Sequence, residues 1–127
     1  MPFTVMIVED DPSTRRLYRF LLANSGYMVI EAEDGYTAFE LFSQQPCDVI
    51  ITDLNMPRMD GFDLVRAIRA QSTEVYIIMV TAFGTLDVEK EAFKVGVSEY
   101  LTKPFDFDDI LRSIKLFFER RSSATPG

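Results

Sequence analysis

Short runs of apolar residues alternate along the chain with longer segments in which apolar residues recur every three or four positions. The short runs are Val5–Val8, Met28–Ala32, Val49–Ile51, Val75–Val80 and Tyr100–Leu101. Because they are apolar at successive positions, they predict strands buried on both faces of a parallel sheet. The intervening spacing predicts amphipathic helices, most clearly in Ile110, Leu111, Ile114, Phe117 and Phe118. Five strand–helix pairs in succession predict an α/β domain with helices on both faces of the sheet.

Residues that begin or end helices agree with this division. Asp11-Pro12 predicts an N-cap followed by proline at the first helical position. Asp106 is expected to cap the last helix, and Gly26 and Gly96 follow helical segments as C-terminal glycines do. The segment 86–95 has the weakest apolar stripe. We expect residues 1–121 to form one domain and residues 122–127 to be a flexible tail or the stub of a linker.

Composition narrows the functional classes. The chain has 127 residues and a net charge of −7, so we expect no direct binding of nucleic acid. The absence of histidine excludes zinc-hydrolase sites and histidine-activated nucleophiles. One cysteine, Cys47, excludes an internal disulfide and fits a reducing compartment. No apolar run approaches the ~20 residues that span a bilayer, so a soluble cytoplasmic protein without membrane contact is expected.

Charged and hydroxyl side chains follow four of the predicted strands. Glu9-Asp10-Asp11 follow the first strand, Asp53 the third, Thr81 the fourth and Lys103 the fifth. Because the carboxyl ends of parallel strands meet at one edge, these groups should converge there. Two like charges ~4 Å apart cost about 4 kcal/mol at an effective dielectric of 20, so the acids need a cation. Oxygen ligands without histidine or thiolate favour Mg²⁺.

Four motifs in this order resemble one family closely. They are Ile7-Val8-Glu9-Asp10-Asp11, Asp53-Leu54-Asn55-Met56-Pro57-Arg58-Met59-Asp60-Gly61, Val80-Thr81-Ala82 and Tyr100-Leu101-Thr102-Lys103-Pro104-Phe105. Over residues 4–120 the chain resembles the receiver domains of two-component response regulators. The resemblance implies a flavodoxin-like (βα)5 fold, doubly wound, with a five-stranded parallel sheet in the order 2-1-3-4-5.

The resemblance also implies a role for each site residue. Asp53 would be the phosphoacceptor, supplied by a sensor histidine kinase or a histidine phosphotransferase. The Mg²⁺ ligands would be Asp10, Asp53 and the Asn55 backbone carbonyl, with Glu9 acting through water. Lys103 and Thr81 would contact phosphoryl oxygens, and the Lys103–Pro104 bond would be cis. The domain would not be an enzyme beyond catalysing its own phosphorylation and slow dephosphorylation.

Signal output and signal lifetime depend on residues around this site. Thr81 is expected to move towards the phosphoryl group and Tyr100 to rotate inward. These movements would change the face made by the helix at 86–95, the strand at 100–101 and the last helix. We also expect that a homodimer could form through this face. Asn55 and Phe83 would control the attacking water and hence the lifetime of the phosphoryl group.

Other functional classes fit less well. A phosphatase of the haloacid dehalogenase type would need a second aspartate where the chain has Asn55, and the acids after the first strand would repel a flavin phosphate. The alternative that stays open is a receiver-like interaction module that works without phosphorylation. The segments 81–87 and 103–106 resemble single-domain sporulation regulators more than chemotaxis ones. The output is either an unidentified downstream protein or a C-terminal effector domain missing from this chain.

Overall fold

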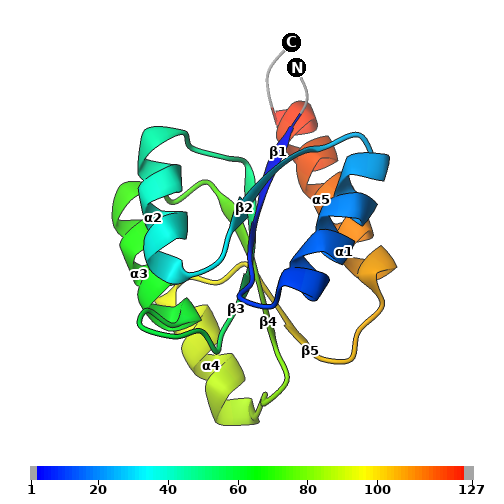
Figure 1. Cartoon of the computed structure of the whole chain (residues 1–127). Helices are drawn as coiled ribbons and strands as arrows, with labels where there is room; N and C mark the ends of the chain where they lie inside the picture. Colours follow the sequence, from blue (N-terminus) through cyan, green and yellow to red (C-terminus); the bar gives the residue numbers. More distant parts are fainter. Residues whose placement is uncertain (1–2, 125–127) are drawn as a thin grey trace.

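The computed structural model describes residues 3–124 and contains one five-stranded parallel sheet between two layers of helices. Along the chain the elements are β1 (Thr4–Val8), α1 (Pro12–Asn24), β2 (Met28–Ala32), α2 (Gly35–Gln44), β3 (Val49–Asp53), α3 (Gly61–Gln71), β4 (Tyr76–Thr81), α4 (Leu86–Val95), β5 (Glu99–Thr102) and α5 (Phe107–Ala124). The strand order is β2-β1-β3-β4-β5, as expected. Helices α1 and α5 cover one face, and α2, α3 and α4 cover the other (Figure 1).

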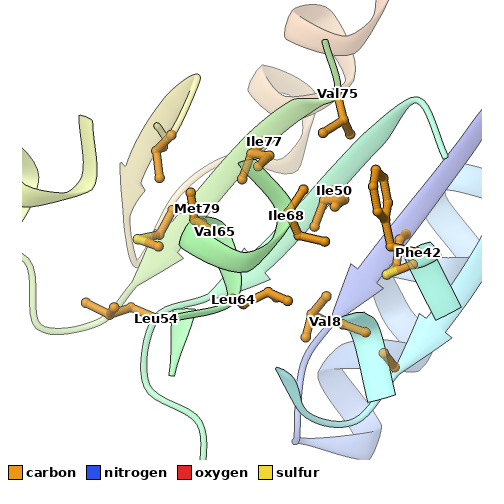
Figure 2. Close-up of a cluster of buried hydrophobic side chains, with 14 of the residues drawn as sticks. Val8, Phe42, Ile50, Leu54, Leu64, Val65, Ile68, Val75, Ile77 and Met79 are labelled. Carbon is orange, nitrogen blue, oxygen red and sulfur yellow. The ribbon is translucent and has the colours of Figure 1, made fainter. Parts of the chain in front are cut away.

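The sheet separates two apolar cores. Alternate residues of β3 face opposite sides, so Ile50 belongs to the core beneath α2, α3 and α4, whereas Val49 and Ile51 face α1 and α5. Figure 2 shows the first core, in which Phe42 of α2 and Ile68 of α3 lie over the strands. All five residues of β3 are buried, which confirms that continuous apolar runs in this sequence are two-sided strands.

The predicted helix ends are present. The Asp11 carboxylate accepts a hydrogen bond from the Thr14 amide at 2.9 Å, and Pro12 is the first residue of α1. Gly96 ends α4 with φ +118°, and Gly26 follows α1 with φ +92°. Asp106 accepts from the Asp108 amide at 3.0 Å at the start of α5. These contacts satisfy backbone groups that helix ends leave unpaired.

Helix α5 is longer than the sequence predicted. It continues to Ala124, so residues 122–124 are helical rather than part of an unstructured tail. The preceding turns supply hydrogen-bond acceptors for these small residues, which is sufficient to extend a helix that is already formed. The remaining residues of the expected tail, 125–127, lie outside the described part of the chain.

Helix α4, the segment with the weakest apolar stripe in the sequence, buries few residues. Ala92 is its one buried residue. Arginines of α3 hold the helix: Arg66 pairs with Glu91 at 3.1 Å, and Arg69 donates to the Gly96 carbonyl at 2.9 Å. The second half of α4 is therefore attached to α3 by polar contacts as well as by the partly buried Val95.

None of the helices within residues 3–124 is long and apolar enough to cross a membrane.

Candidate functional site

The side chains that follow the strands converge at the carboxyl edge of the sheet. Asp53 is the last residue of β3 and Thr81 the last of β4, while Glu9 and Lys103 directly follow β1 and β5. Strands β1, β3, β4 and β5 are consecutive neighbours, so this edge assembles groups that are 94 residues apart in the chain, from Glu9 to Lys103. Three carboxylate oxygens, one from each of Glu9, Asp10 and Asp53, lie within 4.8 Å of one another. The predicted acidic cluster is thus present, and Asp11 serves as a helix cap beside it.

Lys103 neutralises part of this cluster. Its Nζ donates to Asp53 Oδ2 at 3.1 Å. Burial opposes the charge of Lys103, but the hydrogen bond and the negative charge of Asp53 outweigh it and raise the lysine pKa. The Lys103–Pro104 peptide bond is cis, as the resemblance implied.

Glu9 is a buried carboxylate with one oxygen that lacks a hydrogen-bond partner. Its side chain is 3% exposed, and its Oε2 has no hydrogen-bond partner, whereas Oε1 accepts from the Asp11 amide at 3.3 Å. Burial raises the pKa of Glu9 to about 7; the neighbouring carboxylate of Asp53 acts in the same direction, and Lys103 opposes them. A buried carboxylate oxygen without a partner is costly, so the site favours an additional positive charge.

The donor set fits a hard divalent cation. Glu9 and Asp53 are buried and Asp10 is exposed, so one side of the cluster is open to water. Carboxylates and water without sulfur or imidazole are the ligands that Mg²⁺ prefers. The residues present therefore satisfy the requirements of a magnesium site.

Asn55 and Thr81 are joined by their side chains. The Asn55 Nδ2 and the Phe83 amide each donate to Thr81 Oγ1 at 3.2 Å, and the Asn55 amide donates to Asp53 Oδ1 at 3.3 Å. The Phe83 side chain is 76% exposed, so its ring lies at the rim of the site in solvent. The structure thus brings together Asp53, Asn55 and Thr81, and it places Phe83 at their edge.

Tyr100 is turned inward in this structure. Its ring packs against the core beneath α4, and its hydroxyl is buried without a hydrogen-bond partner. A Cβ built on Gly84 would overlap this hydroxyl and lie 2.5 Å from Thr102 Cγ2, so glycine leaves the space that the hydroxyl occupies. The inward conformation that was expected for Tyr100 after phosphorylation is therefore the one that this structure already has.

A small apolar groove of about 310 Å³ flanks Lys103. It is lined by Thr14, Leu17, Tyr18, Leu21, Lys103, Pro104, Phe105 and Phe107. Leu17 and the neighbouring Phe20 on α1 are 54% and 61% exposed. An apolar surface therefore adjoins the cation that contacts Asp53.

Two further residues, Asp34 and Arg58, were not predicted from the sequence to interact. Asp34 is buried, although charged, and pairs with Arg58 in the loop that follows β3. The dipeptide Asp34-Gly35 before an amphipathic segment could have predicted the N-cap of α2. Nothing in the sequence indicated the contact with Arg58.

Comparisons with known proteins agree with this geometry. A family model for the response regulator receiver domain matches residues 5–115. A probable transcriptional regulator, ycf27 of Guillardia theta, is 36% identical over 120 residues, which are 94% of this chain and 47% of that protein. Sporulation initiation phosphotransferase F of Bacillus subtilis is 27% identical, over 94% of this chain and 96% of that protein. The chain spans about half the length of ycf27 and of several other curated relatives that it matches.

Solved structures share the fold closely. The chemotaxis protein CheY4 of Vibrio cholerae superposes with a TM-score of 0.86 at 34% identity, covering 92% of this chain and 99% of that one. The receiver domain of response regulator 1452 from Francisella gives a TM-score of 0.88 at 28% identity, over 94% and 98%.

Proposed function

Because the chain belongs to the family of response regulator receiver domains, we propose that Asp53 accepts a phosphoryl group from a phosphohistidine of a kinase or phosphotransferase. The observation that carries the proposal is the pairing of Asp53, buried at the end of β3, with Lys103 beside two further carboxylates. The Asp53 carboxylate is held by a lysine nitrogen 3.1 Å away. It is also oriented for attack on an electrophile that approaches from the open side.

In the proposed reaction, an Asp53 carboxylate oxygen forms a bond to phosphorus as the phosphorus–nitrogen bond of the donor breaks. The leaving imidazole takes its proton from water. Asp53 Oδ2 is held by Lys103, and Oδ1 accepts from the Asn55 amide. Asp10, Asp53 and the Asn55 carbonyl, with Glu9 acting through water, would hold Mg²⁺, which would supply charge neutralisation for the phosphoryl oxygens. Catalysis by the chain then consists of positioning and electrostatic stabilisation of phosphoryl transfer to its own Asp53.

Thr81 is proposed to transmit the change. Its Oγ1 accepts two hydrogen bonds, so the hydroxyl proton is available to donate to a phosphoryl oxygen on Asp53. Movement of Thr81 would alter the packing of Tyr100 and hence the face made by α4, β5 and α5. We propose that this face binds the output partner or a second copy of the chain. A few kcal/mol of differential stabilisation are sufficient for such a switch.

The apolar groove beside Lys103 supports docking of the donor on α1. Leu17 and Phe20 expose large apolar side chains there, and Arg16 adds a positive charge in solvent. An apolar surface next to a reactive group would fit the side of a helical donor. A cytoplasmic location fits these donors and the free buried Cys47.

The signal could pass either to an effector domain on the same polypeptide or to a separate partner protein. Relatives named as transcriptional regulators are about twice as long as this chain, which favours an effector domain on the same polypeptide. The Bacillus relative has nearly the same length, which favours a separate partner. The receiver-like module that works without phosphorylation is the alternative function.

Phosphorylation can be tested with a small donor. Wild-type protein incubated with Mg²⁺ and acetyl phosphate should gain the mass of one phosphoryl group, and peptide mapping should locate it on Asp53. Asp53→Asn should abolish the gain, whereas Asp87→Asn, an exposed aspartate at the start of α4, should retain it. A wild-type protein that gains no phosphoryl group would favour the interaction module, and labelling of Asp53→Asn would contradict the assignment.

A further inference from the structure

Among the described residues, one buried carboxylate lies outside the acidic cluster. Asp34, at the N-terminus of α2, is 4% exposed. Its Oδ1 accepts from the Thr37 amide at 2.8 Å and so caps the helix. Its Oδ2 accepts from Arg58 Nη2 at 2.5 Å, across 24 residues of sequence. The hydrogen bond from the Thr37 amide lowers the pKa of Asp34, and the positive charge of Arg58 lowers it further, so Asp34 is charged at neutral pH.

Arg58 has an unusual backbone conformation. Among the described residues it is the only one other than glycine with a positive φ, at +69°. A Cβ disfavours this region, and arginine has no special tendency to adopt it. Its guanidinium also lies 5.7 Å from the centre of the Tyr36 ring. The contacts with α2 therefore hold Arg58 in a conformation that its own backbone disfavours.

The neighbouring residue packs against the same helix end. A Cβ built on Gly35 would lie 2.8 Å from the Met59 carbonyl oxygen and 2.9 Å from its Cβ. Glycine at position 35 thus allows the loop of residues 54–60 to rest directly on the first turn of α2. Arg58 and Met59 together attach the outer part of this loop to α2.

The same loop carries Asn55 beside the phosphoacceptor. The backbone amide of Asn55 donates to Asp53 Oδ1, and the backbone amide of Gly61 donates to the Leu54 carbonyl at 2.8 Å, which closes the loop. The conformation between these two points sets where the Asn55 carbonyl points. Arg58 is three residues from Asn55 in the sequence. Its contacts with α2 therefore restrict the backbone conformation of the loop that carries the Asn55 carbonyl.

We propose that Arg58 is a positioning residue for magnesium binding, which it promotes by fixing the loop on α2 through Asp34. This inference rests on the proposed function, in which the Asn55 carbonyl is a ligand. Without the ion pair, the loop would occupy additional conformations, and only a fraction of molecules would present the carbonyl correctly. The apparent dissociation constant rises in inverse proportion to that fraction.

Four variants separate this role from a general effect on stability. Arg58→Gly removes the ion pair but suits a positive φ, so the metal-free protein should keep a melting temperature close to that of wild type. Arg58→Lys retains the charge but not the planar guanidinium. Asp34→Ser removes the carboxylate while serine still caps α2. Arg66→Ala, which removes an exposed arginine that pairs with Glu91, is the control.

Mg²⁺ binding is measured by calorimetric titration, and hydrogen exchange of the loop amides is measured in the metal-free protein. Arg58→Gly and Asp34→Ser should each weaken Mg²⁺ binding by about twofold to fivefold, the range expected for an ion pair whose arginine is 66% exposed. The double variant should be no weaker than either single one, Arg58→Lys should be intermediate, and Arg66→Ala should match wild type. Amides of residues 55–60 should exchange faster in Arg58→Gly.

The possible failures are distinguishable. Wild-type affinity for Mg²⁺ in Arg58→Gly, or additive effects of Arg58→Gly and Asp34→Ser, would overturn the inference and leave the proposed function intact. If the wild-type protein does not bind Mg²⁺, or if Asp10→Asn binds Mg²⁺ as tightly as wild type does, the proposed metal site is wrong and the inference falls with it.

Discussion

Replacing Glu9 by glutamine should stabilise the metal-free protein at alkaline pH. The fold places this carboxylate, 3% exposed and with Oε2 unpartnered, next to Asp53. Its pKa rises from an ordinary value of 4.5 to about 7. Since one pKa unit corresponds to about 1.4 kcal/mol, ionised Glu9 costs the folded state about 3 kcal/mol.

The sign determines the pH window. The folded state binds the Glu9 proton more tightly than the unfolded state does. The stability associated with protonated Glu9 is therefore complete below pH 4.5 and is lost as the pH rises through about 7. Glutamine does not titrate, so Glu9→Gln should equal wild type near pH 4.5 and exceed it by up to about 3 kcal/mol at pH 8. This corresponds to roughly 10 °C in melting temperature.

Urea unfolding followed by circular dichroism, at pH 5, 6, 7 and 8 with a chelator, measures this difference. Glu40→Gln, an exposed glutamate on α2, is the control. Adding Mg²⁺ should stabilise wild type more than Glu9→Gln and reduce the difference at pH 8. A difference between wild type and Glu9→Gln that stays constant from pH 5 to 8 would refute the argument that burial of an uncompensated charge at this site weakens the fold.

Three further predictions concern the remaining site residues. Asp10→Asn should raise the metal-free melting temperature but reduce the stabilisation by Mg²⁺, which for wild type is about 2.7 kcal/mol at a hundredfold excess over Kd; a lower metal-free melting temperature than wild type would contradict this. Thr81→Ala should still accept a phosphoryl group on Asp53, but the amide chemical shift changes that phosphorylation causes in α4 and β5 should be lost. Phe83→Glu should shorten the lifetime of the aspartyl phosphate several-fold, because a carboxylate at the rim can orient a water molecule; equal or slower decay, followed by mass spectrometry in Mg²⁺, would exclude Phe83 from this control.

The fold was predictable because strands buried on both faces have a distinctive pattern. Val49–Ile51 is apolar at every position, and the structure buries all of β3. The site was predictable for a topological reason: residues that follow neighbouring parallel strands must meet at one edge. Glu9, Asp53 and Lys103 could therefore be placed together without knowledge of any contact between them.

The remaining features depend on conformations that local sequence does not specify. The pairing of Arg58 with Asp34 requires a positive φ at an arginine, which no residue preference predicts. The inward position of Tyr100 depends on the space left by Gly84, which lies in another loop. The end of α5 was misjudged because serine and alanine are compatible with both a tail and a helix. In each case the packing around the residue, rather than its own chemistry, determined the outcome.

Because α4 is attached to α3 near its C-terminal end, a rotation of the helix about that end would displace its first turn the most. Its C-terminal end is fixed where Arg69 donates to the Gly96 carbonyl, and its first turn follows the loop that leaves Thr81. A helix of this length extends about 15 Å, so a tilt of about 10° around the fixed end moves the first turn by about 2.5 Å. Exposed Leu86 would travel furthest and Phe93 much less. A partner that contacts the first turn of α4 would therefore detect a small movement of Thr81 as a displacement larger than a bond length.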